Sequence, residues 1–402
     1  MSKMLVLWLA LLGLASPATA TDPLGFWADP QRGANSFNRM PPSQAYFDAL
    51  AATGATWVRL AYDKWPSRGR DFLIGNADHY QGLVQADLAC LRAVLDRAHK
   101  AGLKVVLTPL SLPLMRWAQN NDGRFDDRLW QTPANWEAAT RFWRDLARAL
   151  KGHPAVAAYN LINEPAPERN GGLAEHASEA EMKAWYQKQQ GSGRDLRAFY
   201  QTLITAVRSQ DVRMPIMLDA GWYAAADGFA YWPGALGDGR ILYSVHMYEP
   251  YHMTSDPASL KRPALAYPGM APFGASEAYW NRERVAAYLG NFTRWAEQAG
   301  LPASRLVFGE FGCLRRWPGC ASYLEDVLNV AERSGVHWAF YAFREDAWDG
   351  MDYELGSAPV PWEYWQAAEA GRPDPVQRHG SALFDVIGRY LQGSLKPAQS
   401  AP

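Results

Sequence analysis

The sequence predicts an α/β protein built as one (β/α)8 barrel of the TIM type. First, short apolar segments alternate with amphipathic segments along most of the 402 residues, which is the order of strands and helices in α/β folds. Second, several apolar segments are continuous rather than alternating, as parallel strands buried on both faces are. Third, no glycine-rich nucleotide-binding signature opens a helix, which makes an open, doubly wound sheet the less favoured alternative.

Eight apolar segments are the predicted barrel strands. They comprise residues 33–37, 57–61, 105–108, 156–162, 216–219, 241–246, 306–310 and 337–343. Seven amphipathic segments are the predicted helices, at residues 43–53, 87–100, 136–150, 196–209, 284–299, 321–334 and 382–391. Gly54, Gly102 and Gly152 follow the first three helices, as glycine commonly does at a helix C-terminus.

Three connections are much longer than the others, and all three lead from a strand to a helix. They are residues 165–193 after the fourth strand, 247–280 after the sixth and 344–377 after the eighth. In a barrel these connections gather at the C-terminal face, where active sites lie. We therefore expect them to build a cleft around the functional site.

Residues 1–20 are predicted as a cleaved signal peptide. Lys3 precedes the apolar run 4–15, and Ala18-Thr19-Ala20 offers the small residues of a cleavage site. The run is shorter than the roughly 20 residues that a membrane-spanning helix needs, and no later segment is long enough. We expect an exported protein, periplasmic or extracellular, with one (β/α)8 domain over 21–392, a frayed tail over 393–402 and no membrane span.

Composition excludes one class of partner. The formal net charge is −1, so the chain carries no basic surplus of the kind that nucleic-acid-binding proteins use. Aromatic residues are abundant, with 18 Trp, 19 Tyr and 15 Phe. Such an excess can serve either core packing or flat surfaces for a ligand, and composition alone does not separate the two.

The cysteines and histidines predict no metal site. Cys313 and Cys320 enclose a six-residue loop, and in an oxidising compartment a disulfide is favoured over two free thiols. Cys90 lies in a helical pattern and is expected to be a small buried side chain. Neither the three Cys nor the eight His show metal-ligand spacing, so we expect no metal and no cofactor.

Two glutamates stand at the ends of predicted strands. Glu164 follows the fourth strand and Glu310 ends the seventh, which brings both to one mouth of the barrel. Either alone would more often be a surface or ion-paired residue. Together they are the pair that glycoside cleavage needs, because one carboxyl protonates the leaving oxygen while the other attacks the sugar carbon or activates water.

Five motifs follow one another along the predicted strands. They are Arg32-Gly33-Ala34-Asn35, Trp57-Val58-Arg59-Leu60, Asn163-Glu164-Pro165, Tyr243-Ser244-Val245-His246-Met247-Tyr248-Glu249-Pro250 and Gly309-Glu310-Phe311-Gly312. With these motifs in order, the mature chain resembles glycoside hydrolase family 5, the cellulase-like retaining glycosidases. The resemblance implies that Glu164 is the general acid/base and Glu310 the nucleophile.

The resemblance also implies supporting roles. Asn163 would bond the sugar 2-hydroxyl, and His246 would contact the acid/base side of the site. Arg59 and Tyr248 would hold Glu310 ionised, because a cation and a phenol donor lower the pKa of a carboxyl. Two alternatives stay open: His246 as a core histidine, and Arg59 in an ion pair with some other carboxylate.

Two positions depart from the family. The stretch 105–113 has no histidine after the third strand, and the eighth strand places Tyr341 where the family has a tryptophan floor, with Trp338 close by. Both changes bear on substrate choice rather than on the carboxylate pair.

The tryptophans divide into two groups by position. Trp136, Trp143 and Trp295 fall in helical patterns and are expected to pack the core. A second group follows strands, where it could stack on sugar rings or pack the loops: Trp65, Trp117, Trp222, Tyr223, Tyr251 and Trp348.

The favoured hypothesis is a monomeric, exported, retaining β-glycosidase, endo-β-glucanase-like, acting on a β-linked poly- or oligosaccharide. The alternatives are a non-catalytic glycan-binding protein on the same scaffold, a mannanase, or an enzyme that trims or transglycosylates an exopolysaccharide. Endo and exo action are not separated by the sequence.

Overall fold

The computed structural model describes residues 22–346, 348–370, 372, 375, 376, 378 and 380–393. The predicted signal peptide, residues 1–20, lies outside this part of the chain, as do residues 394–402 of the predicted tail. Within the described part, no helix is both long and apolar enough to cross a membrane.

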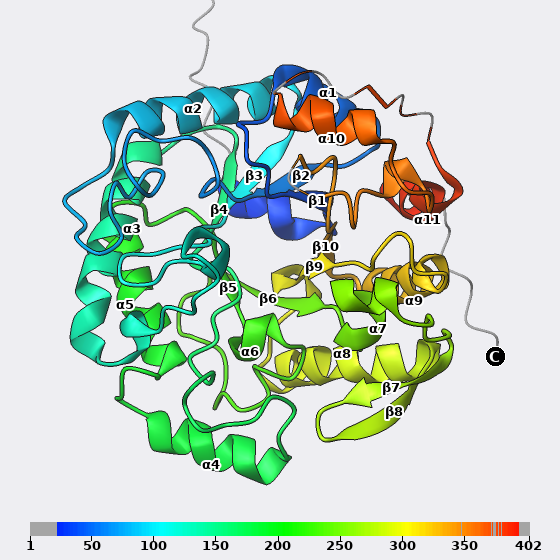
Figure 1. The fold of residues 1–402 in the computed structure, drawn as a ribbon. Coiled ribbons are helices and arrows are strands. Elements are labelled where there is room, and N and C mark those ends of the chain that lie inside the picture. Colours follow the sequence, from blue (N-terminus) through cyan, green and yellow to red (C-terminus); the bar gives the residue numbers. More distant parts are fainter. Residues whose placement is uncertain are drawn as a thin grey trace, which may run out of the picture.

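Eight parallel strands close into a barrel, which confirms the predicted fold (Figure 1). Around the barrel the order is β1-β10-β9-β6-β5-β4-β3-β2. The strands are β1 Arg32–Ser36, β2 Trp57–Leu60, β3 Lys104–Leu107, β4 Val156–Asn160, β5 Ile216–Asp219, β6 Ile241–Met247, β9 Leu306–Phe311 and β10 His337–Phe340. β4 and β10 end earlier than predicted, because the apolar run of each continues into the turn that leaves the sheet.

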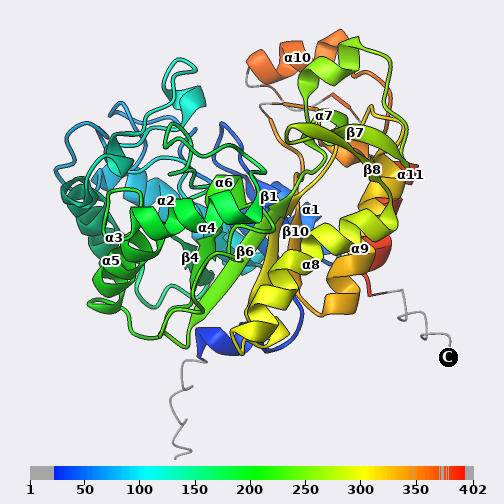
Figure 2. The ribbon, with the colours of Figure 1, turned by 90° about the horizontal axis from the view of Figure 1, so that it is seen from below.

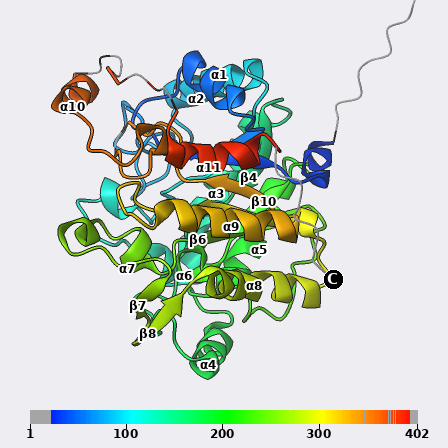
Figure 3. The ribbon, with the colours of Figure 1, turned by 90° about the vertical axis from the view of Figure 1, so that its right-hand side faces the viewer.

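The predicted helices surround the barrel. They are α1 Gln44–Ala52, α2 Gln85–Lys100, α3 Trp136–Leu150, α5 Leu196–Arg208, α8 Arg282–Gln298, α9 Cys320–Ser334 and α11 Ala382–Leu391. Figure 3 shows α8, α9 and α11 side by side across one flank. Helix α3 shows why the helices pack against the barrel. Its buried residues recur every three or four positions, so one face covers the strands and the other faces solvent.

The long connections contain structure that the sequence pattern did not predict. Among the described residues they hold α4 Glu179–Gln189, α7 Tyr251–Thr254, α10 Trp362–Glu369 and an antiparallel hairpin of β7 Gly269–Phe273 and β8 Ser276–Trp280. Pro268 and Pro272 hid the hairpin, since proline argues against a central strand, but it is tolerated in a two-stranded sheet where every strand is an edge. The short helix α6 Gly221–Ala224 follows β5, and the 3-10 turns are η1 Pro23–Ala28, η2 Ala118–Asn120, η3 Arg128–Trp130, η4 Pro133–Asn135, η5 Pro257–Lys261, η6 Ala303–Arg305 and η7 Tyr353–Leu355.

The two ends of the barrel differ. In Figure 2, η1 lies across one end, while α7, α10 and the β7–β8 hairpin rise at the other. Trp27 of η1 packs edge-on against Trp57 and donates its indole N–H to the carbonyl of Ala157 at 3.1 Å, which closes the N-terminal end. The C-terminal end is left for the long connections.

The structure also places the three helical tryptophans and the three cysteines. Trp136, Trp143 and Trp295 are buried, as expected for core residues. Cys313 and Cys320 are joined by a disulfide where the connection after β9 enters α9. Cys90 on α2 is half-buried and has no disulfide partner.

Trp27→Ala should lower the free energy of unfolding by about 3–5 kcal/mol, because it empties a buried indole site and strips a carbonyl of its donor. Chemical denaturation measures the loss. Trp27→Phe keeps an aromatic ring and should lose less. A Trp27→Ala protein as stable as the wild type would contradict the proposed role of η1 in closing the barrel.

Candidate active site

The two glutamates lie close together at the C-terminal mouth of the barrel. Glu310 is part of β9, and Glu164 lies four residues beyond the end of β4. Carboxylate oxygens of both, and a ring nitrogen of His246, lie within 4.8 Å of one another. Retaining glycosidases hold their two carboxyl groups roughly 5–5.5 Å apart, whereas inverting enzymes need about 6.5–9.5 Å to fit a water.

Arg59, on β2, is the centre of the polar network. Its side chain is fully buried, with Nη1 2.5 Å from Glu310 Oε1 and Nη2 2.9 Å from Asp219 Oδ2. The same guanidinium donates to Asn163 Oδ1 at 2.8 Å and to Asn160 Oδ1 at 2.6 Å. Arg59 thus forms ion pairs with two carboxylates at once, that of Glu310 and that of Asp219.

Glu310 is bound through both of its oxygens. Arg59 holds Oε1, and the Tyr248 hydroxyl donates to Oε2 at 2.8 Å. Burial raises the pKa of the Glu310 carboxyl, and His246, Arg59 and the Tyr248 hydroxyl oppose that rise. Arg59 and Tyr248 therefore do lower the pKa of Glu310, as expected from the sequence. The loss of solvent around the buried carboxyl raises the pKa by more.

Glu164 has a different environment. Burial raises its pKa to about 8, with the Asp219 carboxylate adding to the rise and Arg59 opposing it. Its backbone is left-handed, with φ at 48°, and its N–H donates to Asp219 Oδ2 at 3.2 Å. Left-handed backbone is unfavourable for a residue with a side chain, so this bond helps to hold Glu164 at the mouth.

His246, near the end of β6, lies between the acidic groups. Its Nδ1 is 2.8 Å from Glu164 Oε1 and its Nε2 is 3.6 Å from Asp219 Oδ2. Burial lowers the pKa of the imidazole, which favours the neutral ring. A neutral ring can donate to an ionised Glu164 or accept from a protonated one, so His246 suits a carboxyl that changes its protonation.

Sequence reasoning missed Asp219, Asn160 and Asn35. Asp219 ends β5 with its side chain fully buried, and Asn35 on β1 donates to the carbonyl of Gly309 beside Glu310 at 2.9 Å. One signal was available for Asp219, because a carboxylate at the last position of a barrel strand points to the catalytic face. No comparable signal marks Asn160. Asn35 is the last residue of the first family motif, but no role was assigned to it from the sequence.

A comparison with known proteins shows the family of this chain. The model of the family described as Cellulase (glycosyl hydrolase family 5) matches residues 22–347. The chain belongs to glycosyl hydrolase family 5. The matched region is thus a glycoside hydrolase domain.

Three similar proteins place the hydrolase within a varied family. A curated "Beta-xylosidase" of Phanerodontia chrysosporium is 20% identical over 341 residues, and the match covers 78% of this chain but only 62% of that protein. Pseudomonas stutzeri endoglucanase Cel5A matches with a TM-score of 0.59 at 17% identity, over 92% of this chain and 95% of that one. Thermotoga maritima Cel5A, in complex with mannotriose, matches with a TM-score of 0.57 at 14% identity, over 82% and 94%.

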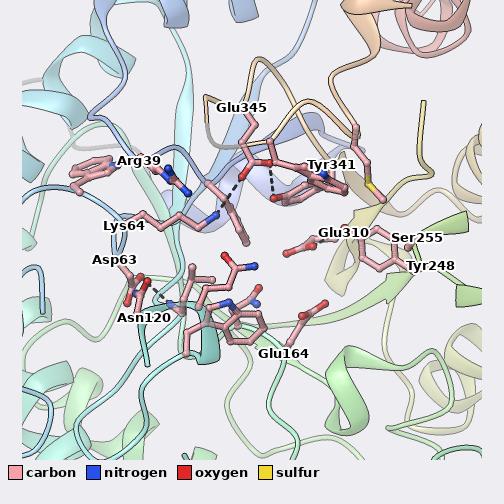
Figure 4. A pocket seen from close by; sticks show the side chains of 18 of the residues that line it. Arg39, Asp63, Lys64, Asn120, Glu164, Tyr248, Ser255, Glu310, Tyr341 and Glu345 are labelled. Atoms are coloured by element: carbon pink, nitrogen blue, oxygen red, sulfur yellow. Dashed lines mark hydrogen bonds and ion pairs between the residues drawn. The ribbon is translucent and has the colours of Figure 1, made fainter. Parts of the chain in front are cut away.

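Two pockets meet at the glutamates of the hydrolase. The first, of about 830 Å³, contains both Glu164 and Glu310, and Figure 4 shows its labelled side chains around them. The second, of about 940 Å³, reaches Glu164 and lies under the connections after β4, β5 and β6 and the β7–β8 hairpin. Four residues line both pockets: Trp117, Glu164, Tyr248 and Tyr251.

The post-strand aromatic residues of the hydrolase all line these pockets. Trp65 and Trp348 line the first, Trp222 and Tyr223 the second, and Trp117 and Tyr251 both. Lining a pocket does not exclude packing within a loop. Trp65 is buried and its ring packs edge-on against Phe72, so it contributes to loop packing as well as to the pocket wall.

The two positions that depart from the family motifs both contribute residues to the first pocket. Tyr341 lines it and donates its hydroxyl to Glu345 at 2.7 Å, and Glu345 also accepts from Lys64 at 3.2 Å. Trp338 is fully buried away from the pocket. After β3, Leu110 lines the pocket, and Asp63 accepts its backbone N–H at 2.8 Å.

Two groups of side chains in the described residues have metal-ligand spacing. They are Glu164, His246 and Glu310, and Glu175, His176 and Glu249. In the first group Arg59 already supplies the positive charge. In the second group, His176 Nε2 lies 3.0 Å from Glu249 Oε1, within hydrogen-bond distance.

Asp219→Asn should move the alkaline limb of the pH profile to lower pH. In the wild type we expect hydrolysis to fall as the pH rises through about 8, where a proton donor with the pKa of Glu164 is lost. Removing the negative charge of Asp219 should lower the pKa of Glu164, because the positive charge of Arg59 then favours the ionised carboxylate more strongly. The pH dependence of kcat/KM measures the shift. The matched control is Asp211→Asn, a buried aspartate just before β5, far from the mouth; an unmoved limb in Asp219→Asn would contradict the argument.

Proposed function

We propose that this hydrolase is an exported, retaining, endo-acting β-glycosidase of the endo-β-glucanase type. The observation that carries the proposal is the carboxylate pair, with oxygens of Glu164 and Glu310 within 4.8 Å of each other. That spacing suits double displacement and leaves little room for the attacking water of an inverting enzyme.

In the first step the ionised Glu310 attacks the anomeric carbon, and Glu164 gives its proton to the glycosidic oxygen. The sugar–oxygen bond breaks, the leaving sugar departs with the proton, and a glycosyl ester forms on Glu310. In the second step ionised Glu164 takes a proton from water, the resulting oxygen attacks the same carbon, and Glu310 is released as a carboxylate.

The exchange of roles by Glu164 follows from charge. Glu164 and Glu310 repel each other when both are ionised, which raises the pKa of Glu310 and, by reciprocity, that of Glu164. Forming the ester removes the charge of Glu310. The pKa of Glu164 then falls, so the group that began as an acid becomes a base.

Asn163 has the geometry to bind the reacting sugar. Arg59 holds its side-chain oxygen at 2.8 Å, and the residue lines the first pocket. The amide NH2 also hydrogen-bonds Glu164, which lowers the pKa of that carboxyl. An amide NH2 has two hydrogens, so one remains for a sugar hydroxyl, and we assign it the 2-hydroxyl.

The pocket arrangement supports cleavage inside a chain. Glu310 lines only the first pocket, so the sugar under attack lies there. Glu164, the proton donor, lines both pockets, so the leaving part of the glycan extends into the second. Space on both sides of the glutamates, rather than a closed end, suits an endo-acting enzyme.

Export is supported by two observations. Residues 1–20 have the pattern of a signal peptide, and Cys313 and Cys320 form a disulfide, which persists in oxidising compartments. A function as a binding protein alone is disfavoured, because glycan binding does not need two carboxylates assembled around Arg59. A mannan or an exopolysaccharide remains the second candidate substrate, since Tyr341 builds the first pocket differently from a tryptophan floor.

Glu310→Gln should abolish hydrolysis, since an amide cannot form the glycosyl ester. Glu164→Gln should slow polysaccharide cleavage by about 10²–10⁴-fold, but should slow formation of the ester far less with an aryl glycoside whose leaving group needs no proton. Reducing-end release and burst kinetics measure these effects, with Glu297→Gln as control, an exposed residue of α8 that lines neither pocket. A Glu310→Gln enzyme at wild-type rate would overturn the mechanism.

A panel of β-1,4-glucan, β-1,3-glucan, mannan, xylan and bacterial exopolysaccharides should identify one β-linked polymer as preferred. On that polymer we expect viscosity to fall early relative to reducing-end release, because internal cleavage shortens chains before many ends form. NMR of the first product should show retained anomeric configuration. Release of only monomer or dimer from chain ends would contradict the endo assignment.

A further inference from the structure

The turn after β5 has an unusual backbone. Trp222, Tyr223 and Ala224 follow one another with φ values of 46°, 57° and 63°. Left-handed backbone crowds the side chain of an L-residue, and such residues normally occur singly. Three in a row need support from the surrounding structure.

Glu168 supplies that support from the connection after β4. Its side chain is fully buried, and Oε2 accepts the backbone N–H of Trp222 at 3.1 Å. Oε1 accepts a short hydrogen bond from the Tyr186 hydroxyl on α4. A Cβ on Gly221 would lie 2.2 Å from Oε1 and 2.8 Å from the Tyr186 hydroxyl, so the carboxylate lies directly against the turn and a side chain at 221 would have to displace it.

A second contact ties the turn to the catalytic segment. The backbone N–H of Tyr223 donates to the carbonyl of Pro165 at 3.2 Å, next to Glu164. Trp222 and Tyr223 both line the second pocket, whereas Glu168 lines neither pocket. The carboxylate therefore acts on the pocket wall from behind.

Burial disfavours the charged form of Glu168, and the proposed mechanism gives this carboxyl no role. Its pKa is raised to about 7, chiefly by loss of solvent. A carboxyl kept in the interior away from the reacting atoms calls for a separate reason.

We propose that Glu168 is a positioning residue that holds the left-handed turn 221–224 and thereby sets Trp222 and Tyr223 as the wall of the second pocket. It thus determines how the leaving-side sugars of the glycan bind. The inference rests on the proposed function in one respect: it takes the second pocket as the leaving side.

The decisive experiment is a double-mutant cycle between Glu168→Ala and Gly221→Ala. The first removes the carboxylate, and the second pushes a methyl group into it, so each should displace the same turn. We expect each to raise KM for the preferred polysaccharide roughly tenfold, the order of effect of one misplaced aromatic contact. Gly221→Ala should add little in the Glu168→Ala background.

The kinetic comparison separates positioning from general damage. With an aryl glycoside, whose leaving group fills little of the second pocket, Glu168→Ala should change kcat/KM less than twofold. Glu168→Gln should rescue polysaccharide binding, because its amide oxygen can accept from Trp222 while its NH2 donates to Tyr186. Equal losses on both substrates, or additive effects in the cycle, would overturn the proposal.

A second readout needs no substrate. Hydrogen–deuterium exchange should rise in the peptide covering 221–225 in Glu168→Ala, and should stay at wild-type level in Glu168→Gln. Tyr186→Phe, which removes one hydroxyl only, should give an intermediate rise and serves if Glu168→Ala does not fold. Unchanged exchange in Tyr186→Phe and Glu168→Ala would overturn the inference, whatever the outcome for the proposed catalytic roles.

Discussion

The buried charge of Arg59 is the constraint on which the site depends. A guanidinium with no solvent contact costs several kcal/mol unless it is paired and fully hydrogen-bonded. Here it is balanced by Glu310 and Asp219 and bound by Asn160 and Asn163. These partners come from three other parts of the barrel, β9, β5 and the end of β4. Their meeting at one cation fixes the relative placement of those strand ends, and with them the two glutamates.

The same cation gives the two glutamates different environments. Glu310 touches Arg59 directly and also accepts from Tyr248. Glu164 meets Asp219 through its backbone and His246 through its side chain, without a cation at bonding distance in the described residues. An acid that keeps its proton and a nucleophile that loses it need such a difference, although both lie in the same dry mouth. The long connections line two pockets that meet at this mouth, so under the proposed function the same loops would bound the reacting groups and the glycan.

Sequence reasoning succeeded where a short segment carries both an element and its chemical group. The eight strands, Glu164 and Glu310 were found this way, because apolar runs ending in polar residues mark barrel strands and their C-terminal ends. Arg59 and Tyr248 were predicted from the family resemblance. It failed where the partner is distant or the local signal is misleading. Pro268 and Pro272 hid the hairpin, and the balance between burial and neighbouring charges at Glu310 depends on the packing of the whole mouth.

The amino-acid sequence by itself determined the barrel, the pair of glutamates and the family resemblance, because alternating elements and strand-end motifs are local patterns. Only the tertiary structure decided what surrounds them. Asp219 joins Arg59, Glu164 and His246, and Glu168 reaches the turn at Trp222 across 54 residues of sequence. Such contacts are set by how strands and loops close in space, where a buried polar group must find its partner however far apart the two lie in the chain.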